Sequence, residues 1–288
     1  MTGSDERRIV VGVDEGTDSA LALDWAADHA DAVDARLSLV YAEFNPYLIA
    51  AGDAGVPPAV ELGFPQLQPH QLLDDATARV ARAHPRLHVD TLCESVSPTT
   101  LLLHQAHTAS LVVLGNHGAT VLSELLMGSV CGSVATKAAC PVVAVRAREC
   151  DEPIDAEVVV GADGSATCEK AVRFAGRFAD AHDKKLRIVH VTRQDNHPER
   201  IDKAIEHTES LITELTSVHP GLGVCAEYTA GDPVRVLTSA VTRSHLLVVG
   251  ARGRNTAAAL LNGSVSHALI RQARCPVAVV GKECALTG

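Results

Sequence analysis

The sequence lacks several features that would each have pointed to a particular class of protein. No run approaches the roughly 20 apolar residues that cross a bilayer, and the first eight residues, MTGSDERR, lack the apolar core of a signal peptide. We therefore expect a cytoplasmic protein without a membrane span. The 8 cysteines form no Cys-x-x-Cys, so neither a structural zinc site nor a dithiol redox motif is predicted.

An excess of positive charge is also missing. The formal net charge is −10, which argues against the basic surface that binding to nucleic acid requires. A phosphate loop ending in Gly-Lys-Ser or Gly-Lys-Thr occurs nowhere, and this excludes a Walker-type motor or kinase. His104 and His107 have helical spacing but no evident third ligand, so no metal site is predicted.

What the chain does contain is a glycine pattern that occurs twice. An apolar run is followed by Gly-x-x-Gly, by nine further residues and by Gly-Ser. The members are Gly115, Gly118, Gly128 and Ser129 in the first copy, and Gly250, Gly253, Gly263 and Ser264 in the second. One copy alone could be turn glycines and an ordinary helix start, but the repetition favours a ligand-binding motif.

The chemistry of this pattern suits a phosphate group. Glycine lets the backbone approach a ligand closely, because it has no Cβ. The Gly-Ser pair precedes an expected helix, whose first N–H groups have no partner within the helix and whose dipole favours an anion. Ser129 adds a hydroxyl donor at the same place.

The whole chain repeats in the same way, with Asp14 and Asp163 ending two β-branched runs 149 residues apart. We expect strands at 9–14, 37–42, 87–92, 111–114 and 142–145, and again at 158–163, 186–191, 224–228, 246–249 and 277–280. Helices are expected at 19–30, 71–83, 99–107, 130–137, 169–179, 201–218 and 234–242. This alternation predicts an α/β protein with parallel sheets and helices on both faces.

A length of 288 residues suits two domains, which we place at 1–147 and 157–288 with a linker at 148–156. The two glycine motifs are only 135 residues apart, so the first half carries an insertion. Residues 43–69, rich in Pro, Gly and Ala, are its expected place. A lid or an interface remains an alternative there, but an exposed excursion is favoured.

On these residues the chain resembles the universal stress proteins, in the arrangement that carries two such domains in tandem. The resemblance rests on Asp14 and Asp163, on the glycine pattern of the family's ATP-binding branch, and on the Cys-Pro-Val strands that start at Cys140 and Cys275. It implies two Rossmann-like domains of the adenine nucleotide alpha-hydrolase-like kind. Each would be a five-stranded parallel sheet of order 3-2-1-4-5, with fifth-strand edges pairing between domains or subunits.

The resemblance also implies an ATP site in each half. The two aspartates would face adenine or ribose, Gly12 and Gly161 would let the nucleotide approach, and Ala42 and Val191 would line the adenine pocket. The glycine loops would surround ribose and phosphates. The implied site residues are Gly12, Asp14, Ala42, Gly115, Asn116, His117, Gly118, Gly128, Ser129 and Val130, and in the second half Gly161, Asp163, Val191, Gly250, Ala251, Arg252, Gly253, Arg254, Gly263, Ser264, Val265 and Ser266.

Two differences between the copies lead us to predict tighter ATP binding in the second half. Ala119 stands where the second copy has Arg254, and Cys131 stands where it has Ser266. A lost cation or hydroxyl beside phosphate costs on the order of 1–3 kcal/mol.

The expected function is that of an ATP-binding regulatory protein of the stress response. Nucleotide occupancy would control its conformation or its binding to an unidentified regulatory protein, with magnesium accompanying ATP and a homodimer forming in addition to the intramolecular pairing. A slow ATPase and a structural protein with a decayed site are the alternatives. No nucleophile, base and acid occur at convincing spacing, and the stretch 14–19 lacks the glycine pair of the ATP pyrophosphatase loop that it faintly resembles.

Overall fold

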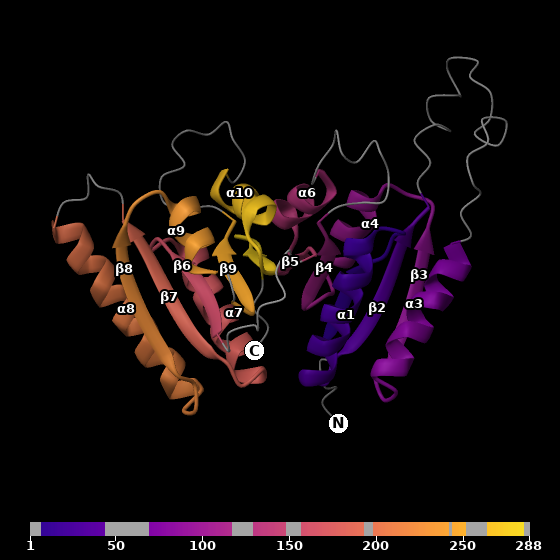
Figure 1. Cartoon of the computed structure of the whole chain (residues 1–288), viewed down its shortest axis with the longest axis horizontal. Helices are drawn as coiled ribbons and strands as arrows, with labels where there is room; N and C mark the ends of the chain where they lie inside the picture. Colours follow the sequence, from indigo (N-terminus) through magenta and orange to yellow (C-terminus); the bar gives the residue numbers. More distant parts are fainter. Residues whose placement is uncertain are drawn as a thin grey trace, which may run out of the picture.

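The computed structural model describes residues 7–43, 69–116, 129–147, 157–192, 198–241, 244–251 and 264–284. Its centre is one ten-stranded sheet that runs through both halves of the chain (Figure 1). The strand order is β3-β2-β1-β4-β5-β10-β9-β6-β7-β8. Every neighbouring pair is parallel except β5 and β10.

The first half supplies one outer part of this sheet. Its elements are β1 (Arg8–Gly12), α1 (Thr17–Ala32), β2 (Arg36–Ala42), α3 (Pro69–Ala83), β3 (Val89–Glu94), α4 (Pro98–Gln105), β4 (Leu111–Gly115), α6 (Ser129–Lys137) and β5 (Val142–Val145). The second half repeats them as β6 (Glu157–Ala162), α7 (Ala166–Ala181), β7 (Lys185–Thr192), α8 (Pro198–Val218), β8 (Val224–Ala230), α9 (Pro233–Ala240), β9 (Leu246–Gly250), α10 (Ser264–Gln272) and β10 (Val277–Val280).

Each half thus has the strand order 3-2-1-4-5 that the resemblance implied, and the α/β class is confirmed. The strands and helices expected from the pattern are found within a few residues of their expected ranges. The expected insertion, 43–69, lies outside the described residues except for its two end residues, and so does the linker, 148–156. Among the residues described, no helix is long and apolar enough to span a bilayer.

Three helices begin with an N-cap residue of a type that is favoured at that position. Ser97, Ser165 and Asp232 each accept a hydrogen bond on the side chain from the backbone N–H three residues later. A proline follows Ser97 and Asp232, where its missing N–H costs nothing. These local signals fix where α4, α7 and α9 begin.

The core consists of two layers, one on each face of the sheet. One layer joins α1, α3, α7 and α8 to strand residues such as Val11 and Val160, and the other joins α4, α6, α9 and α10 to the alternate residues, such as Val10 and Val159. Because side chains alternate along a strand, each buried strand feeds both layers. Both layers contain residues from both halves.

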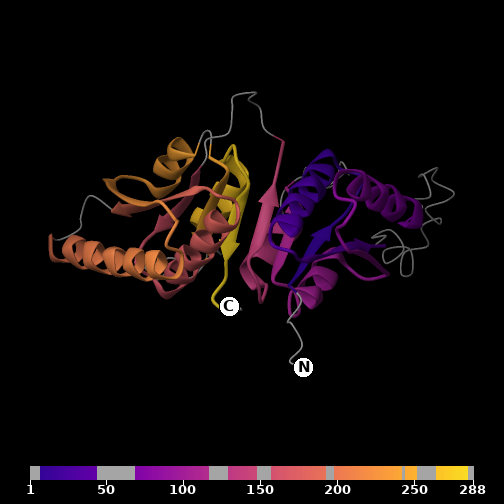
Figure 2. The same ribbon diagram turned by 90° about the horizontal axis from the view of Figure 1, so that it is seen from below.

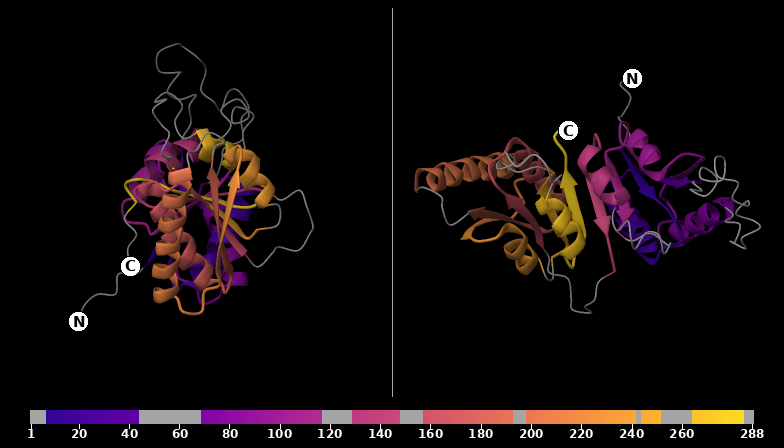
Figure 3. Two further views of the ribbon diagram at one scale, coloured as in Figure 1. Left: turned by 90° about the vertical axis from the view of Figure 1, so that its left-hand side faces the viewer. Right: turned by 90° about the horizontal axis from the view of Figure 1, so that it is seen from above.

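The halves meet where β5 pairs with β10. Val143 lies opposite Ala278 in an antiparallel ladder, and both strands are buried along their whole length. Seen from below, the two strands lie side by side in the middle of the molecule (Figure 2). From above, α6 and α10 lie next to them (Figure 3, right). The fifth-strand edges are therefore paired within one chain, which leaves β3 and β8 at the two outer edges.

Candidate functional site

The topology creates the same switch point in each half. β1 lies between β2 and β4, and β6 lies between β7 and β9. The chain therefore continues from β1 to β2 on one side and from β4 to β5 on the other side, and the second half repeats this divergence. Ligands of open α/β sheets bind at such a switch point, beyond the carboxyl ends of the strands. Val11 is opposite Val113 and Val160 is opposite Val248, so the loops after β1 and β6 begin beside the ends of β4 and β9.

Asp14 lies in the first of these loops. Its Oδ1 accepts a hydrogen bond from the N–H of Gly16 at 2.7 Å, and its own N–H donates to Oγ of Ser19 at 2.9 Å. Desolvation by the surrounding protein raises the pKa of the Asp14 carboxyl above its ordinary value, with a smaller contribution from the nearby Asp18, although hydrogen bonds to the carboxyl from the Gly16 backbone and the Ser19 side chain lower it. Asp14 nevertheless remains exposed, so its carboxylate is accessible to a ligand at the switch point.

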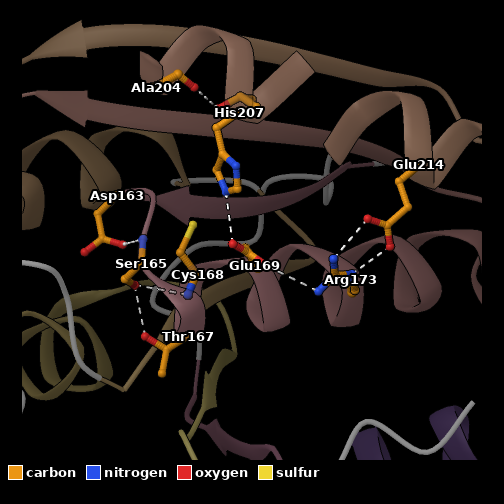
Figure 4. Close-up of polar contacts among 10 residues, drawn as sticks. Asp163, Ser165, Thr167, Cys168, Glu169, Arg173, Ala204, His207 and Glu214 are labelled. Atoms are coloured by element: carbon orange, nitrogen blue, oxygen red, sulfur yellow. Dashed lines mark hydrogen bonds and ion pairs between the residues drawn. The ribbon is translucent and has the colours of Figure 1, made fainter. Parts of the chain in front are cut away.

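The corresponding loop of the second half is built on Asp163 (Figure 4). Its Oδ1 accepts from the N–H of Ser165 at 3.0 Å, and Oγ of Ser165 accepts from the N–H of Cys168 at 3.2 Å. Gly16 holds the equivalent position in the first half and begins α1 without a side-chain hydrogen bond. The two aspartates therefore form the same kind of turn, each in its own half. The helix that follows has a side-chain cap only in the second half.

Gly115 and Gly250, the first glycines of the repeated pattern, lie against the helix that follows Asp14 or Asp163. A Cβ on Gly115 would be 2.8 Å from backbone atoms of Asp18 and Ser19, and one on Gly250 would be 3.1 Å from Oγ1 of Thr167. Gly115 leaves no room for a side chain because the first turn of α1 packs directly on the strand end, and the first turn of α7 packs less closely on Gly250. The sequence reading assigned them to a ligand-facing turn and did not anticipate this packing.

Gly12 and Gly161 have a similar explanation. Added Cβ atoms would lie 2.7 Å from Leu114 Cδ2 and 2.8 Å from Leu237 Cδ1, in the layer that faces α4 and α9. The resemblance implied that these glycines make room for the nucleotide. In the structure the atoms nearest to an added Cβ are leucine methyl groups, so close packing also favours glycine at both positions, and their role in nucleotide binding stays a prediction.

Asn116 lies at the boundary between the two halves. Its side chain is 6 % exposed, and Nδ2 donates to the carbonyl of Ile270 in α10 at 3.0 Å, across the boundary between the halves. Ala251, its counterpart, is also buried and donates its N–H to Val280 in β10. The amide donor of Asn116 is therefore engaged in holding the halves together, and its contact with a nucleotide stays a prediction.

The contrast between Cys131 and Ser266 lies in buried positions. Both side chains are 3 % exposed, and burial raises the pKa of the Cys131 thiol to about 12. Their burial gives no support to a hydroxyl contact with phosphate as a reason for tighter binding in the second half. That prediction then depends on Arg254, which lies outside the described residues.

Several implied residues are where the pattern requires them. α6 begins at Ser129 and α10 at Ser264, Ala42 and Val191 lie in β2 and β7 on the side of α4 and α9, and Val130 and Val265 pack on the same layer. The remaining implied residues lie outside the part of the chain that the structure describes: His117, Gly118, Gly128, Arg252, Gly253, Arg254 and Gly263. Within the described part, no group of three or more His, Cys, Asp or Glu side chains could hold a metal ion.

The model of the universal stress protein family matches residues 6–146 and again residues 156–281. The chain belongs to the universal stress protein family. Universal stress protein Rv2623 of Mycobacterium tuberculosis is 28% identical over 297 residues, covering 98% of both chains. Rv2005c, a further universal stress protein of the same organism, is 28% identical over 291 residues and covers 94% of this chain and 96% of its own.

Solved structures agree with this assignment at the level of the fold. A universal stress protein from Archaeoglobus fulgidus superposes with a TM-score of 0.65 at 17% identity, covering 96% of this chain and 97% of that one. The chain is therefore a universal stress protein with two tandem domains of the family fold.

Proposed function

We propose that this universal stress protein binds ATP with magnesium at two sites, one in each of the units 1–147 and 157–288. The observation that carries the proposal is the topological switch point, where the loop that contains an exposed carboxylate, Asp14, lies beside the end of β4. The second half repeats the same arrangement with Asp163 and β9.

The roles of the residues follow from their positions. Asp14 and Asp163 would accept hydrogen bonds from the ribose or the adenine, and Ala42 and Val191 would provide apolar contact for the base. The helices α6 and α10 would present their first N–H groups and the hydroxyls of Ser129 and Ser264 to the phosphates. A helix N-terminus stabilises an anion without any dedicated side chain, which fits an acidic protein that binds ATP.

Binding at these sites would be regulatory. Asp14 hydrogen-bonds with the first turn of α1, and α1 packs on β1, β4 and β5, so a ligand that orders this loop stabilises the region where the halves meet. A ligand stabilises whichever conformation binds it better. We further propose that nucleotide occupancy controls binding to a regulatory protein and that the chain also forms a homodimer.

The first experiment is to purify the protein without added nucleotide, denature it and count the released nucleotide by chromatography. One to two ATP per chain are expected. ADP in place of ATP would favour slow hydrolysis. Protein that is empty and also shows no heat of binding on titration with ATP and magnesium would overturn the proposal.

Variants then separate the two sites. Asp14→Asn and Asp163→Asn should each weaken one site by about tenfold, because each loses a charge-assisted hydrogen bond. Asp34→Asn is the matched control: Asp34 is exposed, has a φ of 51° that Asn also tolerates, and lies at the far end of α1. Titration with ATP measures the affinity of each variant, and an unchanged affinity at both sites in all three variants would show that these aspartates are not part of the sites.

A further inference from the structure

Where the halves meet, α1 and α7 are joined by a cluster of aromatic and histidine side chains, which we call the α1–α7 seam. Its members are Trp25 and His29 of α1, Phe174 and Phe178 of α7, His182 at the end of α7, and His245 before β9. Trp25 stacks on Phe178 with ring centroids 5.6 Å apart, and His182 stacks on Phe178 at 4.3 Å. In the view from below, the two helices flank β5 and β10 (Figure 2).

The centre of the seam is a hydrogen bond between two histidines from different halves. Nδ1 of His29 lies 2.8 Å from Nε2 of His182. In such a pair one nitrogen must donate and the other must accept, so the bond cannot survive protonation of both rings. His29 is 8 % exposed and His182 is half-buried, so even one added proton places a charge in a poorly solvated site.

The charged groups that face the pair from the surrounding elements are basic. Burial, together with the nearby His182, His245 and Arg7, lowers the pKa of His29 to about 3. Burial also lowers the pKa of His182 to about 4, together with His245 and Lys184. Burial lowers the pKa of the half-buried Arg177 of α7, and the nearby Arg7 lowers it further.

The nearby carboxylates of the two helices have other histidine partners. Asp28 and Asp31 of α1 pair with His84 at 3.0 and 3.3 Å. Asp180 of α7 pairs with His219 at 2.8 Å. Protonation of His29 or His182 therefore adds positive charge next to basic groups, because the side chains that lower the pKa of these two histidines are themselves basic.

The internal repeat shows that the fold itself does not require these histidines. At the offset of 149 residues, the counterpart of His29 is Phe178 and the counterpart of His182 is Val33. Apolar side chains thus satisfy the same positions in the other copy. Of the two equivalent pairs between α1 and α7, one is His29 with His182, and the other, formed by their counterparts, is Phe178 with Val33.

We propose that the His29–His182 pair, with His245 beside it, makes the α1–α7 seam an acid-sensitive contact that loosens when the pH falls below about 6.5. The sign follows from linkage. A histidine in the loosened or unfolded form has a pKa near 6.5, whereas the closed seam keeps it neutral to a much lower pH. The closed form therefore binds fewer protons, its stability is fully present above pH 6.5, and it is lost progressively as the pH falls towards 4.

The test uses the full chain and its single tryptophan, Trp25, which lies in the seam and reports on it by fluorescence. Urea unfolding is followed between pH 8 and 4.5 by Trp25 emission and by far-ultraviolet circular dichroism. For one histidine that stays neutral when buried, the unfolding equilibrium constant should rise about 30-fold between pH 8 and pH 5 through this effect alone.

The variants come from the repeat itself. His29→Phe combined with His182→Val should flatten this pH dependence, whereas His104→Gln, which changes an exposed histidine of α4, should leave it unchanged. Equal pH profiles for the double variant and the wild type would overturn the proposal.

A second measurement does not depend on how the variants fold. Histidine ring resonances of the wild-type protein, followed by NMR, should include two that do not titrate between pH 7.5 and 5. If all histidines titrate near pH 6.5, the seam is not built as we propose. Neither measurement involves nucleotide, so its outcome is independent of the ATP proposal.

Discussion

Replacing Gly115 by alanine tests whether the first glycine of the repeated pattern is held by helix packing. The new Cβ would lie 2.8 Å from two backbone atoms of α1, Asp18 C and Ser19 N, where ordinary contacts are 3.4–4 Å. The first turn of α1 would have to move by about 0.6 Å, and overpacking of this kind costs about 1–3 kcal/mol. Alanine recovers only about 0.4–1 kcal/mol by restricting the unfolded chain.

Gly250→Ala is the matched control in the second half. Its Cβ would first meet Oγ1 of Thr167 at 3.1 Å, and its closest backbone atom is 3.3 Å away, so smaller shifts suffice. We therefore expect Gly115→Ala to lower the free energy of unfolding by at least about 1 kcal/mol more than Gly250→Ala.

Urea unfolding at pH 7.5, followed by circular dichroism and Trp25 fluorescence, measures the difference in free energy of unfolding between the two variants. Titration of the folded variants with ATP, without urea, measures binding. If Gly115→Ala is as stable as the wild type but loses ATP binding, the glycine is kept for the ligand and the packing argument is refuted. If the two variants are equally destabilised, the distances do not govern the cost.

Three further predictions concern single contacts. Asn116→Ala should lower the free energy of unfolding by about 1–3 kcal/mol, because a buried carbonyl of α10 loses its donor, and Asn116→Asp should not restore it. Ser165→Ala should cost about 1 kcal/mol through the lost cap of α7, with Ser165→Gly costing only a few tenths; equal effects in urea unfolding would count against the cap. Arg79→Ala should shift the thermal midpoint very little, since its ion pair with Asp24 is exposed and worth about 0.2–1 kcal/mol; a larger loss that 1 M salt does not abolish would contradict this.

The elements of the fold could be read from the sequence because their signals are local. Runs of β-branched residues ending in an aspartate or a glycine predicted β4, β6 and β9 to within one residue at each end and β1 to within two. The third strand was expected at 87–92 but spans Val89–Glu94, since the N–H of Leu87 bonds to the carbonyl of His84 in the turn after α3. Turns of this kind depend on hydrogen bonds that hydrophobic spacing does not encode.

The contacts that determine the site depend on partners far along the chain. No residue near Gly12 in the sequence predicts its contact with Leu114, and no residue near Asn116 predicts its hydrogen bond with Ile270, which is 154 residues away. The repeat did contain one usable signal: the exchange of His29 for Phe178 at matching positions marks a place where the two halves differ.

The antiparallel joint between β5 and β10 has a consequence for how this molecule can evolve. In a symmetric homodimer every interface residue appears twice, so a favourable change on one side is forced on the other side as well. Here both sides are encoded separately, and because they belong to one chain their association does not depend on protein concentration. Asn116 can therefore donate a hydrogen bond to Ile270 of the other half, while the equivalent position in that half carries Ala251, which has no side-chain donor.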